Sequence, residues 1–276
     1  MRAPRIDWTS VGAPVTSCSS IAPSPVAAPL RICVVDAYAR ATSSTPTREG
    51  FVVGEVRVAY AGCRARIAEL TGRLDEQRAA TAVPTCPKWS VHDVVAHVTG
   101  IVDDALAGRL DGVATEPWTA AQVEARRARP IADMLAEWDA NAPSFEELLD
   151  TVGDPGRQAV ADVVTHEHDI RAALVEPGAR DSDAVHIGLG FVSADFVASA
   201  ASQGVAVRVH ATDGSEFGDQ AASVVLSGEP FELLRAITGR RSIAQLRAMH
   251  WQGDGEAAMC AFTFGPFRPA AHRVVE

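Results

Sequence analysis

The stretch DVVTHEHDIRAAL, residues 162–174, places two histidines and three acidic residues in its first eight positions, on an otherwise apolar helical pattern. With about 100° between successive helical residues, Asp162 and His166 lie about 40° apart and project from one face. Apolar residues share that face, namely Ala159, Val163, Ile170 and Ala173. Because buried polar groups are costly without partners, the stretch predicts a core helix whose polar pair binds an ion or is satisfied internally.

A second helix with a histidine is predicted from Ser90 onward. Ser90 and Asp93 form the S-x-x-D version of a capping box, which is typical of a helix start. Further along, Val94 and Ile101 lie on the same helical face as His97. That face should meet the interior of a helical bundle, so His97 is also expected to point inward.

If these two helices are neighbours, His97, Asp162 and His166 converge. Two neutral imidazoles and a carboxylate suit a divalent transition ion, zinc first and nickel or iron also, with an open position for water or substrate. Asp169 falls about 60° from His166 on the Asp162 side, whereas Glu167 rotates away by about 100°. Either acid is a candidate to orient a ligand histidine or to move a proton.

Simpler interpretations remain open for each of these residues. A single histidine such as His97 on an apolar face is often a core residue, so a metal-free bundle is an alternative. For Glu167, His168 and Arg171, a solvated face or a structural ion pair is favoured. Cys86 has no base beside it in the sequence, so a reactive thiol is not favoured. The sequence contains no GxSxG, GxGxxG or GxxxxGK[ST] motif.

Composition narrows the class of protein. The 276 residues are 47% hydrophobic, enough to fill at least one core. A formal net charge of -10 argues against nucleic acid and anionic membrane surfaces as partners. No apolar run is long enough for a transmembrane helix, and no secretory signal is recognised. Five scattered cysteines without a CxxC pair indicate a reducing cytoplasm, and they are Cys18, Cys33, Cys63, Cys86 and Cys260.

Three regions are expected along the chain. Residues 1–50, rich in Ser, Pro, Thr and Ala, predict a disordered extension and raise the hypothesis of a mis-assigned start. Residues 53–178 predict a helical bundle in which Pro130 and Pro143 kink or divide the helices, and 82–89 a loop. Residues 183–270 predict a helix over 183–202 and a small α/β domain, with strands in 204–218 and 222–228, a helix over 229–240 and a late strand over 258–267.

Two stretches resemble signatures of the mycothiol-dependent maleylpyruvate isomerase family of actinobacteria: PTCPKWSVHDVVAHVTG, residues 84–100, and DVVTHEHDIRAAL. A third, VLSGEPFELLRAITGRRS (residues 225–242), is similar to that family's sterol-carrier-like C-terminal domain. Together they cover roughly residues 53–270. The resemblance implies an α+β protein, with a DinB-like up-and-down four-helix bundle followed by a small α/β sterol-carrier-like domain.

The resemblance also implies a histidine–acid–histidine metal triad, which falls on His97, Asp162 and His166. The isomerase has glutamate where this chain has Asp162. A side chain shorter by one methylene shifts the ion or lets a water intervene, which bears on the reaction more than on the metal.

The implied function is a metal-dependent enzyme that uses mycothiol or a similar thiol on a small electrophilic substrate. In an isomerase, a thiolate adds to a cis double bond, rotation follows and elimination leaves the trans product; in a transferase, the thiol stays attached. The alternative is a non-catalytic binding protein for a small ligand, with a structural or vestigial metal. Three arginines are candidates to meet an acidic substrate, namely Arg208, Arg240 and Arg241. Oligomeric state does not follow from the sequence.

Overall fold

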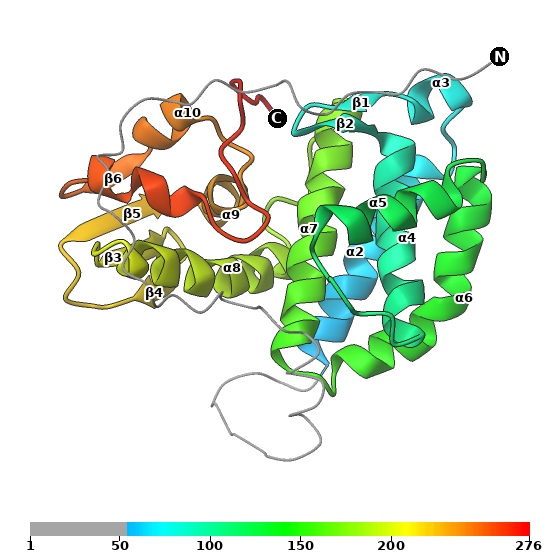
Figure 1. The fold of residues 1–276 in the computed structure, drawn as a ribbon, viewed down its shortest axis with the longest axis horizontal. Coiled ribbons are helices and arrows are strands. Elements are labelled where there is room, and N and C mark those ends of the chain that lie inside the picture. Colours follow the sequence, from blue (N-terminus) through cyan, green and yellow to red (C-terminus); the bar gives the residue numbers. More distant parts are fainter. Residues whose placement is uncertain (1–53) are drawn as a thin grey trace. The chain divides into compact units, whose positions relative to one another are not determined.

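Four long helices form a bundle in the computed structural model, which describes residues 54–276. They are α2 (Glu55–Thr71), α4 (Val91–Leu106), α6 (Ile131–Leu149) and α7 (Asp154–Leu174). Two short helices, α3 (Glu76–Ala79) and α5 (Glu116–Arg126), lie in the connections. Because α5 returns the chain between α4 and α6, these two run in one direction and α2 and α7 in the other (Figure 1). The predicted extension over 1–50 lies outside the described residues.

Local sequence explains where these helices begin. The capping box of α4 is confirmed: the Asp93 amide donates to Ser90 Oγ, and Asp93 Oδ2 accepts from the Ser90 amide. Pro130 stands at the N-cap of α6 and separates it from α5, as predicted. Pro143 does not divide a helix, contrary to one of the two predicted effects, because α6 continues through it to Leu149.

The bundle core is apolar and closely packed. Its largest side chains are less than 2% exposed, among them Ile67, Met134, Trp138 and Ile170. Each buried side chain of this size stabilises the fold by about 1.5–3 kcal/mol. Trp138 donates its indole N–H to the Tyr60 hydroxyl over 3.2 Å, so the one polar atom of the indole is also satisfied. Against this background, polar side chains inside the bundle need a specific reason.

The C-terminal part combines a long helix with a small mixed sheet. Helix α8 (Asp183–Ser202) is followed by β3 (Val207–Ala211), β4 (Glu216–Gly218), β5 (Val224–Gly228), α9 (Pro230–Ile237), α10 (Ile243–Arg247) and β6 (His250–Gln252). The strand order is β4-β3-β5-β6, with β3 and β5 parallel and the other pairs antiparallel. The α+β class is therefore as expected.

By length and composition, α8 is the one helix in the described residues that could span a membrane. Half of its most apolar window is buried inside the protein, and α8 packs against α7, α9 and the sheet. These contacts are those of a core helix.

Three local expectations need correction. The predicted loop over 82–89 contains a hairpin, β1 (Ala82–Val83) with β2 (Cys86–Ser90). The predicted late strand over 258–267 is wrong, because Glu256–Phe262 is a 3-10 helix, η1. Ala258, Ala261 and Phe262 are buried and η1 packs on α8; a short apolar run of this kind does not distinguish helix from strand by periodicity. The fourth strand is β6, which the sequence did not indicate.

Candidate metal centre

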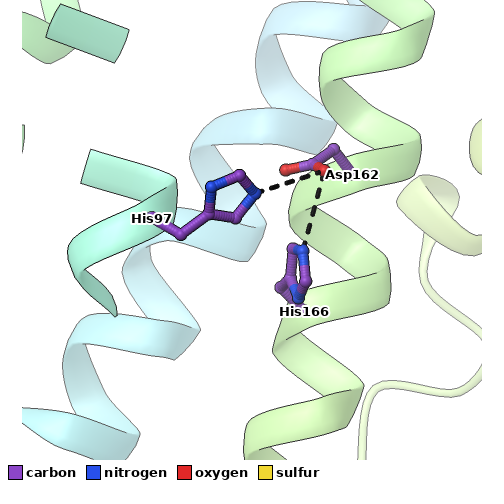
Figure 2. A group of neighbouring side chains, drawn as sticks. All are labelled: His97, Asp162 and His166. Atoms are coloured by element: carbon purple, nitrogen blue, oxygen red, sulfur yellow. Dashed lines mark ion pairs between the residues drawn. The ribbon is translucent and has the colours of Figure 1, made fainter. Parts of the chain in front are cut away.

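His97 of α4 meets Asp162 and His166 of α7 inside the bundle (Figure 2). Asp162 Oδ1 lies 3.8 Å from His97 Nε2 and 3.7 Å from His166 Nε2. One ligand atom from each residue lies within 4.8 Å of the others. These separations exceed the length of a hydrogen bond, so the two Nε2 atoms face the carboxylate without bonding to it. The structure thus brings together the three residues that the sequence singled out.

The spacing suits a small divalent ion. Zinc bonds nitrogen and oxygen ligands at about 2.0–2.2 Å, which places tetrahedral ligand atoms roughly 3.3 Å apart. The observed gaps need only small side-chain shifts to reach this value. His97 and His166 are 3% and 7% exposed, whereas the Asp162 side chain is 34% exposed. The group is therefore buried on the histidine side and open on the aspartate side.

Two successive hydrogen bonds between side chains orient the His97 ring. His97 Nδ1 lies 2.7 Å from Gln122 Oε1, and Gln122 Nε2 donates to Asp104 Oδ2 over 2.7 Å. Because the carboxylate of Asp104 accepts only, it fixes the amide orientation, and Gln122 Oε1 must accept from His97. Nδ1 then carries the proton, and the lone pair of Nε2 faces Asp162, as a metal ligand requires.

Asp169 orients the His166 ring through Nδ1, and it also joins distant parts of the chain. Its carboxylate lies 3.1 Å from His166 Nδ1 and accepts from Thr85 Oγ1, Arg235 Nη2 and Arg240 Nη2, each over 2.7 Å. Burial alone would raise the pKa of Asp169, but the guanidinium groups of Arg240 and Arg235 hold it well below its usual range. Asp169 is thus a buried anion that links α7, the β1–β2 turn and the C-terminal part.

Glu167, the other predicted acid, points to a different neighbour. Its fully buried carboxylate accepts from Arg66 Nη2 over 2.7 Å and from Arg171 Nε over 2.9 Å. Burial opposes ionisation, yet the Arg66 guanidinium lowers the pKa of Glu167. The contacts tie α2 to α7 and leave the metal group untouched. The structural ion pair favoured by the sequence is confirmed.

His168 contradicts the alternative of a solvated face. It is 3% exposed and its ring lies 4.7 Å from the Phe231 ring. Burial, followed by the charge of Arg235, lowers the pKa of His168 to about 4, so it is neutral at pH 7. Both Glu167 and His168 are buried because α7 contacts protein on more than one side. A sequence pattern with a single apolar stripe does not reveal this second buried side.

A cavity of about 380 Å³ opens beside the metal group. Apolar and aromatic side chains form much of its wall, among them Trp89, Ile101, Trp118, Phe145, Leu148 and Phe267. Of the three arginines proposed for an acidic substrate, Arg240 lines the cavity. Arg208 and Arg241 are not part of its wall. Arg208 pairs with Glu216, and Arg241 pairs with Glu232 and Glu276.

Cys86 also lines the cavity, with its sulfur 3.7 Å from Arg240 Nη2 and 3.9 Å from Asp169 Oδ2. Burial raises the pKa of the Cys86 thiol, and the nearby Asp169 carboxylate raises it further. The thiol therefore stays protonated at neutral pH. This agrees with the sequence, which did not favour a reactive cysteine.

Gln122 is a residue that the sequence did not identify. One signal was present: Gly100 stands in α4 one turn after His97. A Cβ at Gly100 would lie 2.6 Å from Gln122 Cβ, so glycine is what lets the glutamine reach the imidazole. A glycine inside an otherwise strong helix marks a close approach by a partner, but it does not say which residue approaches.

Gln122→Ala is expected to lower zinc affinity roughly 10- to 100-fold, because the His97 ring loses the acceptor that fixes its orientation. Competition with a chromophoric chelator measures the affinity. Gln203→Ala, at an exposed position outside the metal group and the cavity wall, is the matched control and should bind zinc as the wild type does. Equal zinc affinity in Gln122→Ala and the wild type would show that Gln122 does not orient His97.

Comparisons with known proteins give one family match and two similar solved structures. Residues 60–185 match the family model described as the mycothiol maleylpyruvate isomerase N-terminal domain. A crystal structure of the mycothiol-dependent maleylpyruvate isomerase is similar, with a TM-score of 0.45 and 10% identity over 69% of this chain and 90% of that chain. A single-residue variant of that enzyme gives 0.45 and 11% over the same shares of the two chains. No curated protein matches the sequence.

Proposed function

Residues 60–185 belong to the mycothiol maleylpyruvate isomerase N-terminal domain family, and on that basis we propose that the protein is a metal-dependent enzyme that uses mycothiol or a similar thiol. Its substrate is a small electrophile. One observation carries the proposal: three ligand atoms from α4 and α7 converge at the wall of a cavity. His97, Asp162 and His166 would hold the ion, with zinc expected first and nickel or iron also compatible.

The donor set fits a catalytic ion better than a structural one. Structural zinc sites are closed by four protein ligands, whereas three protein ligands leave a position open. Here three ligands face a cavity, and Asp162, the most exposed of them, lies on the cavity side. The open position would therefore receive a small molecule that enters the cavity. A structural ion in a small-ligand-binding protein remains the alternative, and a closed shell with a fourth protein ligand would favour it.

A divalent ion in this site would supply a thiolate at neutral pH, the nucleophile for isomerisation or S-transfer. The protein's own groups prepare the site for it. Gln122 and Asp169 hold the Nδ1 protons of the two imidazoles, which keeps both Nε2 lone pairs toward the ion. Arg240, held by Asp169, brings a cation to the cavity wall beside Cys86. The shorter Asp162, in place of glutamate, would set the ion closer to α7.

Thiol-dependent turnover of purified protein tests this function. After elemental analysis, the protein is incubated with mycothiol and either a cis-enone or an alkylating electrophile. We expect turnover that is lost with a chelator and restored by zinc. Recovery of free thiol indicates isomerisation, and its consumption indicates S-transfer. Metal-free protein as isolated, with no gain from added zinc, would contradict the proposal and favour the binding-protein alternative.

The proposal also covers the cellular location, the partners and the domain boundaries. We expect the protein to work in the cytoplasm, where the thiols of Cys63, Cys86 and Cys260 stay reduced. Its partners would be the substrate and the thiol, not nucleic acid or membrane. The boundaries 53–178 and 183–270 remain our proposal for the two domains.

A further inference from the structure

We infer that the substrate of this site carries an apolar body, a chain of several carbon atoms or a ring, which lies in one arm of the cavity. A compact dicarboxylic acid such as maleylpyruvate is then a poor substrate. The inference rests on the proposed function, since it names the substrate class for that site. The apolar arm is defined by Ile101, Ala105, Val113, Leu148, Val152 and Ala159.

The apolar arm begins at the metal group and follows two helices. On α4, Ile101 and Ala105 come one and two turns after His97 and line the same cavity. With a rise of 1.5 Å per residue, Ala105 lies about 12 Å from His97 along the helix. On α7, Ala159 precedes Asp162 by one turn. Because α4 and α7 run in opposite directions, both rows of side chains lead away from the ion toward the same end of the bundle (Figure 1).

The wall of the apolar arm has no charge to offer a substrate. All six defining side chains are hydrophobic, and all six are half-buried while they line the cavity. Apolar surface left open in this way gains about 0.8 kcal/mol for each methylene group of a ligand that covers it. A carboxylate placed there would lose its hydration without gaining a partner.

The two arginines that line the cavity, Arg240 and Arg268, lie outside the apolar arm. Arg240 Nη2 and Nε bond Asp169, and Arg240 Nη1 donates to the Thr238 carbonyl over 2.6 Å. Its charge is thus matched by a buried carboxylate. Arg268, exposed at the rim, donates to the carbonyls of Gly265 and Phe267. One acidic group of a substrate can reach the ion or Arg240, but a second has no cation in the apolar arm.

Two indoles beside His97 complete the fit to an unsaturated substrate. The Trp89 and Trp118 rings lie 5.0 Å and 6.4 Å from the His97 ring, and both line the cavity. Such faces stack on conjugated or aromatic groups. An electrophile with its double bond near the ion would therefore lie beside these rings, with its apolar body in the arm.

Binding of unreactive ketones tests the arm without any turnover. The probes are 2-butanone to 2-octanone, titrated into the zinc-loaded protein without thiol and followed by calorimetry and tryptophan fluorescence. We expect affinity to rise roughly three- to fourfold for each added methylene until the arm is full. Ala105→Phe, which fills the arm, should abolish this dependence. Ala120→Phe, on an exposed position of α5 outside the cavity wall, is the matched control and should preserve it.

Turnover of the corresponding α,β-unsaturated ketones with mycothiol then separates the two proposals. We expect kcat/KM to rise with chain length and to exceed that for maleylpyruvate. Thiol-dependent turnover that is independent of chain length, or that favours maleylpyruvate, overturns the substrate class and leaves the proposed function standing. Chain-length-dependent binding without thiol-dependent turnover of any probe overturns the proposed function, while the apolar arm is upheld as a binding site.

Discussion

His166→Ala is expected to lower zinc affinity by more than the roughly 100-fold that loss of an outer partner costs, and to abolish thiol-dependent turnover. His166 supplies one of three converging ligand atoms and is 7% exposed. With alanine, Asp162 and His97 would remain, and two ligands do not hold a divalent ion tightly. His97→Ala removes a ligand from the opposite helix and should have the same effect.

Elemental analysis and chelator competition on the purified variants measure this loss. His250→Ala is a suitable control, because that histidine is exposed on β6 and lies outside the metal group. It should bind zinc as the wild type does. If His97→Ala and His166→Ala both retain one zinc per chain, these residues are not the ligands, and the zinc binds elsewhere in the protein.

Asp169→Asn is expected to destabilise the protein by about 3–5 kcal/mol, the usual cost of removing one partner from a buried ion pair. The side chain is fully buried and bonds both Arg235 and Arg240. The asparagine has nearly the same shape, so the change removes charge rather than volume. Because the pKa of Asp169 is well below its usual value in the folded state, its contribution is fully present at pH 7. It is lost progressively as the pH falls from about 4, the usual value, toward the folded-state pKa.

Urea unfolding at pH 7, followed by circular dichroism, gives the free energy of unfolding. Asp139→Asn is the matched control, since Asp139 is 63% exposed and pairs with Arg64 at the surface. Such a pair contributes at most about 1 kcal/mol. Asp169→Asn should also weaken zinc binding, because His166 Nδ1 loses its anionic partner. Wild-type stability of this variant would mean that the buried charges are not coupled as the contacts indicate.

The effect of Asp169 on zinc binding connects the metal group to the rest of the molecule. Asp169 orients His166, and the same carboxylate holds Arg235 of α9 and Arg240 of the following loop. Arg235 also donates to the Thr165 carbonyl of α7 over 3.0 Å. His166, a proposed metal ligand on the bundle, is therefore supported by residues some 70 positions later in the chain. Changes in the C-terminal part should reach the metal through this carboxylate.

Sequence alone determined what depends on near neighbours along the chain. Asp162 and His166 share a face because they are four residues apart on a helix, and Ser90 starts α4 because Asp93 stands three residues later. The helical periodicity and the apolar stripes gave the bundle helices and the α+β class. The motif resemblance indicated the family whose N-terminal domain model matches residues 60–185, and it pointed to the three residues now found together.

Only the tertiary structure decided which distant groups meet. Glu167 and His168 are buried because α2 and α9 cover the side of α7 that a one-stripe pattern leaves to solvent. Gln122 reaches His97 because α5 crosses α4 at Gly100, and of three candidate arginines Arg240 alone lines the cavity. Hydrogen bonds and ion pairs between elements depend on how helices pack, and the order of residues in each helix does not contain that information.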